Sequence, residues 1–282
     1  MPYLDRRAIK RTARDLIREP GAGVLAVSLV YLLLTDVLST VLNLVLTNPL
    51  SLIQDQWVKS VSSLLEGAAG ANMEELDLKP AYSATISYAR QMLFTPKQEI
   101  LLFVFLLLFL YTLVMSFGYS DWALRRVRGE QPGWTCLFDR LELAGKFILL
   151  ELLTFLLVGA GIGFFLLPGL YFLYSLRMAR YILLDNPTMS VFQAMRLSRQ
   201  MSRGCKRQLF ALDLSFLGWI VLSNAALMGA FNAGAGIHPV VGMLMGELSY
   251  VVFQLYIAPY RELSLAGFYE AMRAPEGTVL AV

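Results

Sequence analysis

The residues best placed to do chemistry in this sequence are acids that lie inside long apolar stretches. Asp36 lies in the first such stretch and Glu247 in the last, and no basic residue is expected at the same depth. A charge at the centre of a membrane helix costs about 2.5–3.5 kcal/mol or more, so ionisable residues there are candidates for function. Unpaired acids in that position become protonated or bind a cation, which makes Asp36 and Glu247 a candidate proton or cation site. Alternatively, the two acids act separately, facing water at a helix kink or hydrogen-bonding to Asn43, Asn224 or Gln254.

A second group of charges is mixed in sign and lies nearer to the basic ends of its stretches. Its members are Glu151, Arg177, Arg180 and Asp213. Two acids and two bases could pair with one another and clamp neighbouring helices together, and long arginine side chains could also extend to the membrane surface. The other interpretation is an anion or headgroup site, because paired and perturbed charges also gather at functional sites.

The remaining residue types give no support to enzymatic, metal or cofactor chemistry. The chain has two cysteines, Cys136 and Cys205, and a single histidine, His238, with no CxxC or Cys/His spacing suited to zinc, haem or an iron–sulfur cluster. No GxGxxG or Walker sequence occurs. We therefore expect no metal, no cofactor, no catalytic residue and no nucleic-acid partner.

The elements that must position these charges are long apolar helices. Of the 282 residues, 57% are hydrophobic and 16% charged, and the mean hydropathy is +0.58. A soluble domain carries about a quarter charged residues. Because a bilayer core of about 30 Å needs roughly 20 apolar residues per helix, the sequence predicts an all-α polytopic membrane protein with six transmembrane helices plus amphipathic interfacial helices. The predicted spans are Gly23–Leu46, Ile100–Tyr119, Phe147–Ile162, Phe165–Leu184, Phe210–Phe231 and Pro239–Ile257.

The third and fourth spans share one apolar stretch, 147–184, which is interrupted by glycines and by Pro168. This stretch fits either two spans or one span plus a re-entrant piece. Basic segments on both sides favour two spans, because the chain must then leave one side of the membrane and return to it. Two GxxxG pairs, Gly159/Gly163 and Gly242/Gly246, predict close packing between helices.

The distribution of Lys and Arg predicts the orientation. These residues gather in the N-terminal tail, in the loops from Arg125 to Lys146 and from Arg196 to Arg207, and in the C-terminal tail. The positive-inside rule then places both ends of the chain in the cytoplasm.

Three regions follow from this pattern. We expect a basic amphipathic helix over 1–20, a six-span membrane domain over 21–260 with an outer segment over 47–99, and a cytoplasmic C-terminal tail over 261–282.

Amphipathic helices are predicted beside the spans. Leu4–Ile17 and Val191–Arg203 each combine an apolar face with basic residues, so both are expected to lie on the anionic inner leaflet. In the outer segment, apolar residues at helical spacing include Trp57, which suits an anchor at headgroup level. Recognition of a partner protein is the alternative use of these faces.

Several short motifs occur from Ser120 onward, and their residues are Arg128, Gly129, Glu130, Asp185, Asn186, Pro187, Ser198, Arg199, Ser215, Phe216, Gly218, Trp219, Pro259 and Tyr260. In these motifs the sequence resembles a bacterial family of integral membrane proteins, domain-of-unknown-function family nine hundred seventy-five. The resemblance implies six spans in a bacterial plasma membrane and implies no reaction. A more distant likeness, to the membrane domain of some glycerophosphodiester phosphodiesterases, carries no function over.

These observations leave two classes of function open. We expect a non-enzymatic scaffold, protection or assembly factor at the inner leaflet, whose partners are anionic lipids and a membrane protein or a second copy of the chain. The alternative is a small-solute or proton- or cation-coupled transporter that uses Asp36 and Glu247.

Overall fold

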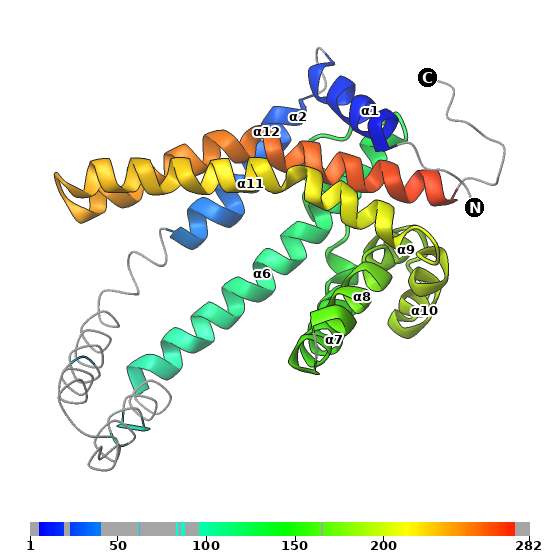
Figure 1. Cartoon of the computed structure of the whole chain (residues 1–282), viewed down its shortest axis with the longest axis horizontal. Helices are drawn as coiled ribbons and strands as arrows, with labels where there is room; N and C mark the ends of the chain where they lie inside the picture. Colours follow the sequence, from blue (N-terminus) through cyan, green and yellow to red (C-terminus); the bar gives the residue numbers. More distant parts are fainter. Residues whose placement is uncertain are drawn as a thin grey trace. The chain divides into compact units, whose positions relative to one another are not determined.

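The computed structural model describes residues 6–19, 23–40, 62, 83, 86–87, 96–164 and 166–273, and every regular element within these residues is a helix (Figure 1). The all-α prediction is therefore confirmed for the described part of the chain. The predicted amphipathic helix around Trp57 lies outside the described residues. The chain forms two compact units, Met1–Val37 with Tyr111–Val282, and Leu38–Leu110. The residues discussed below belong to the first unit.

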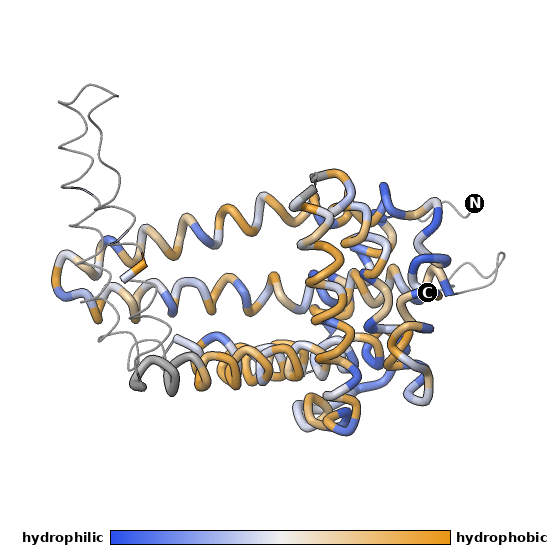
Figure 2. The backbone as a smooth tube through the Cα atoms, turned by 90° about the horizontal axis from the view of Figure 1, so that it is seen from below, coloured by the Kyte–Doolittle hydropathy of each residue, from blue (hydrophilic) through white to orange (hydrophobic). Residues whose placement is uncertain are grey.

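Four described helices are long and apolar enough to cross a membrane: Phe103–Val127, Trp134–Gly163, Lys206–Ala235 and Pro239–Arg273. They correspond to α6 (Pro96–Val127), α7 (Ala144–Phe164) with the short 3-10 turns before it, α11 (Lys206–Ala235) and α12 (Pro239–Arg273). Figure 2 shows hydrophobic residues along most of the length of these helices. The chain is thus a helical membrane protein, whereas the count of six spans is not confirmed.

The first predicted span is described only as far as Thr40. Val24–Thr40 is an apolar helix shorter than the four above. It consists of α2 (Val24–Leu32) followed by a π-helical turn, η1 (Leu33–Val37), which contains Asp36. Irregular π-turns inside helices occur frequently at functional sites.

The fourth predicted span, Phe165–Leu184, is divided. The structure has α8 (Leu166–Leu176) and α9 (Ala179–Asp185), separated by a turn at Arg177 and Met178. At 1.5 Å per residue α8 is roughly 17 Å long, about half of a bilayer core. The break falls at a charged residue, Arg177, which is turned toward an acid on another helix.

Two helical hairpins are closed by glycines. A Cβ added at Gly161 of α7 would lie 2.8 Å from the backbone of Gly169 in α8, and one at Gly234 of α11 would lie 2.7 Å from Gly242 in α12. The prediction for Gly242 and Gly246 holds, because both face α11 closely. The prediction for the other pair is wrong within the described chain, because Gly159 and Gly163 both face open space there and Gly161 makes the contact instead.

Both described amphipathic helices form, but the protein itself covers their apolar faces. α1 (Arg6–Arg18) buries Ile9 and Ala13 and packs on α12. α10 (Val191–Met201) buries Val191, Ala194 and Met195 and packs on α7, α8 and α9. A capping box begins α10: the Ser190 hydroxyl accepts from the backbone amide of Gln193, and the Gln193 side chain accepts from the backbone amide of Ser190. The polar faces of these helices remain for other contacts, together with Phe192 of α10, which is 65% exposed.

The last predicted region, 261–282, is helical in its described part. The predicted tail from 261 begins as a continuation of α12, which runs to Arg273. Leu263, Leu265 and Phe268 are buried there, because apolar residues recur at helical spacing and pack against the core. The helix predicted as a separate N-terminal region belongs to the same compact unit as α12.

Candidate functional site

The two acids predicted as a proton or cation site come from different elements, η1 and α12. The charges of Asp36 and Glu247 are close enough to interact, and both also act on Tyr250, about one turn from Glu247. Neither acid is isolated in the structure. Asn224, one of the amides considered as a neutral partner, donates to the carbonyl of Ile220 on its own helix. No group of three or more His, Cys, Asp or Glu in the described ranges is placed to hold a metal ion.

The mixed cluster is arranged as two ion pairs between helices. Arg180 of α9 donates to Glu151 of α7 with an Nη2–Oε1 distance of 3.0 Å. Arg177, at the break after α8, lies 3.5 Å from Asp213 of α11. A cavity of about 60 Å³ adjoins Glu151, Arg177 and Arg180, which is enough for a few water molecules.

The cluster extends to residues that the sequence did not single out. The Glu262 carboxylate of α12 accepts hydrogen bonds from Ser120 Oγ at 2.6 Å and from the Tyr181 hydroxyl at 2.8 Å. Arg180 also donates to Ser120 at 3.4 Å. Glu262 was missed because it lay in the predicted tail. The continued apolar periodicity after Arg261 was the signal that could have placed it inside the fold.

Arg128 and Asp185, two of the motif residues, join the ends of α6, α9 and α12. Arg128 pairs with Asp185 at 2.7 Å and with Glu270 at 2.5 Å, and the Tyr269 hydroxyl donates to Asp185 at 2.7 Å. Burial disfavours the charge on Arg128, but its hydrogen bonds and ion pairs with Asp185 and Glu270 outweigh this and raise the pKa of the guanidinium. Gly129 has a φ of 87°, which a residue with a side chain rarely adopts. This network stabilises the fold and offers no free group for chemistry.

Other motif residues have similar structural contacts. Ser198 Oγ donates to the carbonyl of Ser175 at 2.8 Å, and Arg199 lies over the ring of Phe172. Three further hydrogen bonds involve motif residues. The Glu130 amide donates to the carbonyl of Arg125, Asn186 Nδ2 donates to the carbonyl of Ile182, and Lys146 Nζ donates to the carbonyl of Pro187.

The last two motifs meet the N-terminal helix. Lys10 of α1 donates to Ser215 Oγ of α11 at 2.8 Å. Its ammonium lies 4.5 Å from the ring centroid of Phe216 and 5.3 Å from that of Tyr260 on α12, and these two rings pack edge to face. Pro259 lies inside α12, which continues past it.

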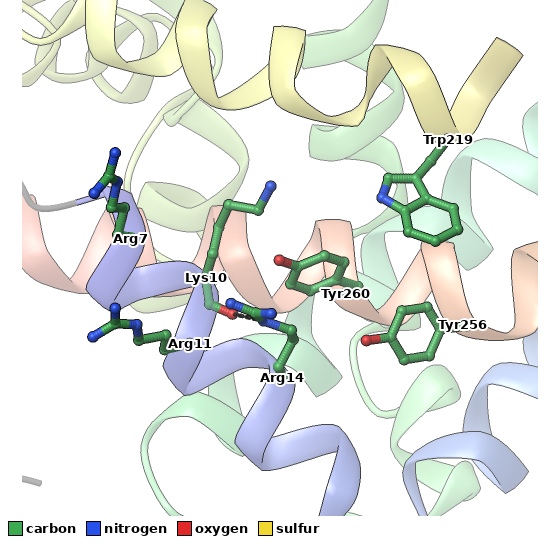
Figure 3. A pocket seen from close by; sticks show the side chains of 7 residues that line it. All are labelled: Arg7, Lys10, Arg11, Arg14, Trp219, Tyr256 and Tyr260. Atoms are coloured by element: carbon green, nitrogen blue, oxygen red, sulfur yellow. Dashed lines mark hydrogen bonds between the residues drawn. The ribbon is translucent and has the colours of Figure 1, made fainter. Parts of the chain in front are cut away.

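Lys10 and Tyr260 line a pocket of about 430 Å³ between α1, α11 and α12, called here the basic pocket (Figure 3). Within the described part of the chain, no ion pair involves Lys10, Arg11 or Arg14. Trp219 was expected to be packed in the bundle, but it is 42% exposed and lines this pocket. The lining residues are Arg7, Lys10, Arg11, Arg14, Trp219, Tyr256 and Tyr260.

The charge of Lys10 is disfavoured by its surroundings. Burial, together with the charges of Arg14 and Arg6, lowers the pKa of the Lys10 ammonium below its ordinary value. The groups that hold the ammonium in place are the Ser215 hydroxyl and the rings of Phe216 and Tyr260, and none of them carries a charge. An anion in the pocket would supply the opposite charge that the described residues around Lys10 lack.

The sequence shows each set of residues that lines this pocket, but it does not show that these sets lie together in the fold. The four cations follow the spacing i, i+3, i+4 and i+7, which places them along one side of a helix. The sequence analysis assigned that side to the membrane surface. Gly218, within the motif at 215–219, faces open space.

The model of one protein family, described as "Protein of unknown function (DUF975)", matches residues 1–276. The chain belongs to this family. Neither a curated protein nor a solved structure matches the chain. Membership therefore confirms the family predicted from the motifs and brings no activity with it, so function has to be argued from the chain's own residues.

Proposed function

We propose that this protein is a non-enzymatic scaffold, protection or assembly factor that acts at the inner leaflet of a bacterial plasma membrane. In this proposal the chain crosses the membrane six times, with both ends in the cytoplasm. The excess of Lys and Arg in the segments expected on that side supports the orientation. Membrane-protein partners or a second copy of the chain would bind there.

The docking of α1 is the observation that carries the proposal. Ile9 and Ala13 attach α1 to α12, so its cations are held on a folded element. A basic residue near an anionic leaflet contributes about 1 kcal/mol of attraction. Arg7, Arg11 and Arg14 are exposed, so several such contributions can act together.

Hydrogen exchange of α1 tests the proposal in the full chain. The protein is placed in lipid discs with and without an anionic lipid, and amide protection is measured over residues 6–18. The variant Arg11→Gln/Arg14→Gln is compared with Arg196→Gln/Arg203→Gln, which removes the same charge from exposed positions on and just after α10.

The expected result is stronger protection of α1 in anionic discs for the wild type and for the α10 control. The α1 variant should show a smaller gain, because it has lost two of the cations that face the lipid. Equal protection of the wild type in both kinds of disc would contradict the proposal.

A second candidate function is a proton- or cation-coupled transporter. The interaction between the charges of Asp36 and Glu247 favours it, because two nearby acids can share one proton or one cation. Flux of protons and of monovalent cations into sealed vesicles holding the full chain tests this candidate. Wild-type flux that disappears in Asp36→Asn/Glu247→Gln and persists in Arg196→Gln would support transport, and absence of flux in the wild type would exclude it for the ions tested.

A further inference from the structure

We propose that the basic pocket binds the phosphoryl group of an anionic ligand, either a phospholipid headgroup or a free phosphate ester. This inference deepens the proposed function and rests on it for the position of the pocket at the inner leaflet. The charge, the hydrogen-bond donors and the shape of the pocket all suit such a ligand.

The charge of the pocket calls for an anion. Like charges three or four residues apart on a helix lie side by side and repel one another, and Arg14 is at this spacing from both Arg11 and Lys10. In the described chain none of these three residues has a carboxylate partner. Burial and two neighbouring arginines also lower the pKa of Lys10, so an anion would relieve an existing electrostatic cost.

The donors suit a tetrahedral oxyanion. A lysine ammonium has three donors, and Lys10 gives one of them to Ser215, which leaves two. Arg14 Nε donates to the carbonyl of Lys10 at 3.3 Å, so this guanidinium is held in place by its own helix while its terminal nitrogens stay available. Planar guanidinium groups bind phosphate through two parallel hydrogen bonds, which strongly hydrated ammonium groups cannot do.

The pocket has a polar and an apolar end. Figure 3 shows the cationic side chains of α1 on one side, Tyr260 between, and Tyr256 with Trp219 on the other. Its volume of about 430 Å³ lies within the range of about 300–1,000 Å³ typical of small-ligand sites. It therefore has room for a phosphoryl group together with an organic substituent.

The apolar end continues along both long helices. Leu222 lies one turn from Trp219 and is 49% exposed, and Val252 lies one turn from Tyr256 and is 63% exposed. Both positions lie beyond Trp219 and Tyr256 in the direction of the turn that joins α11 to α12, away from the residues that Lys10 contacts. A ligand with acyl chains would use this surface, whereas a soluble ester would not.

The test uses the full chain in a non-ionic detergent with three probes. Phosphatidylglycerol carries the phosphoryl group on a lipid, glycerol 3-phosphate carries it in soluble form, and oleate is an anionic lipid without phosphorus. Native mass spectrometry counts the retained probe molecules, and a titration gives the affinity. Arg11→Gln/Arg14→Gln is compared with the charge-matched control Arg196→Gln/Arg203→Gln.

The wild type and the control are expected to retain one phosphatidylglycerol per chain. In the α1 variant the affinity should fall on the order of tenfold or more, because charge-assisted hydrogen bonds are lost. Oleate should show no single saturable site. If glycerol 3-phosphate binds as tightly and with the same dependence on the variants, the ligand is a soluble phosphate ester.

A broad distribution of phosphatidylglycerol that is equal in all three proteins would overturn the proposal. The single variant Arg11→Gln guards against misfolding, because this exposed side chain makes no hydrogen bond in the described chain. The two proposals fail separately. If oleate and phosphatidylglycerol protect α1 alike and no saturable site is found, only the pocket is refuted. If a saturable site is found but α1 shows no lipid-dependent protection, only the proposed function is refuted.

Discussion

Breaking the ion pair between Arg180 and Glu151 should destabilise the protein more than breaking the pair between Arg177 and Asp213. Both pairs join neighbouring helices, and their side chains are similarly exposed, at 25% and 23% for the first pair and 19% and 22% for the second. Solvent screening is therefore comparable. The pairs differ in geometry, and geometry sets the expected difference in coupling energy.

The magnitude follows from two contributions. Coulomb attraction falls inversely with distance, so the change from 3.0 to 3.5 Å removes only about a seventh of it. The larger difference is the hydrogen bond that joins Arg180 to Glu151 and has no counterpart between Arg177 and Asp213. Hydrogen bonds to charged groups contribute about 1.5–3 kcal/mol, which partial exposure reduces. We expect coupling energies of about 2 kcal/mol for the first pair and about 1 kcal/mol for the second.

Double-mutant cycles measure these couplings. One cycle uses Glu151→Gln and Arg180→Gln, the other uses Arg177→Gln and Asp213→Asn, and each compares both single variants with the double variant. The free energy of unfolding is measured by titrating a denaturing detergent into micelles that hold the full chain. Arg180 also contacts Ser120, and the cycle subtracts that contact.

Equal couplings, or a larger one for Arg177 and Asp213, would refute the reasoning from geometry. Mutations at distant, independent sites add to within about 0.3–0.5 kcal/mol. Coupling energies below this value for both pairs would therefore show that neither pair holds the helices together. The anion-site interpretation of the same cluster makes a separate prediction. In that case Arg177→Gln and Arg180→Gln, rather than variants of α1, would abolish retention of phosphatidylglycerol.

Three further predictions concern the hairpin, the network at the helix ends and Lys10. Gly234→Ala should lower the free energy of unfolding by about 1–3 kcal/mol, because the new Cβ meets backbone atoms at 2.7 Å. The control Gly229→Ala places its Cβ in open space and should be neutral or stabilising. Equal melting temperatures of the two variants would contradict this. Tyr269→Phe should lower the unfolding free energy by about 1.5–3 kcal/mol, since the Asp185 carboxylate, whose side chain is 8% exposed, loses a donor at 2.7 Å. An unchanged unfolding midpoint would show that the bond contributes nothing. The folded-state pKa of Lys10 lies below its unfolded value, so the charged ammonium destabilises the fold at neutral pH, and this cost is relieved as pH rises through the folded-state pKa. The stability of the unliganded wild type relative to Lys10→Gln should therefore rise in alkaline solution. A stability difference that falls with pH would refute the shift.

The membrane class could be predicted because hydropathy is a sum over neighbouring residues. Long apolar runs identified the helices that contain Glu247 and Asp213, and these helices form as α12 and α11. The cap at Ser190 was readable for the same reason, since a capping box is a contact between residues three apart. Local patterns of this kind need no knowledge of the rest of the fold.

The limits of helices were less readable where packing overrides local signals. The last span was predicted to end at Ile257, yet the helix α12 continues to Arg273, because residues after Pro259 are buried against the core. The apolar stretch after Phe165 suggested one span, yet it divides at Arg177, whose charge is turned toward Asp213. Burial and pairing partners decided these cases, and both depend on elements distant in the sequence.

The sequence by itself determined the helical membrane class, the family and the residues that carry charge inside apolar stretches. The tertiary structure decided which of these residues meet. Lys10 on α1 precedes Ser215 on α11 by 205 residues, and only the packing of α1 on α12 and of α12 on α11 brings Lys10 to Ser215 and Tyr260. The spacing of cations along α1 indicated a basic face, but the rings and the hydroxyl opposite it are supplied by other helices, and no pattern within a single segment can specify them.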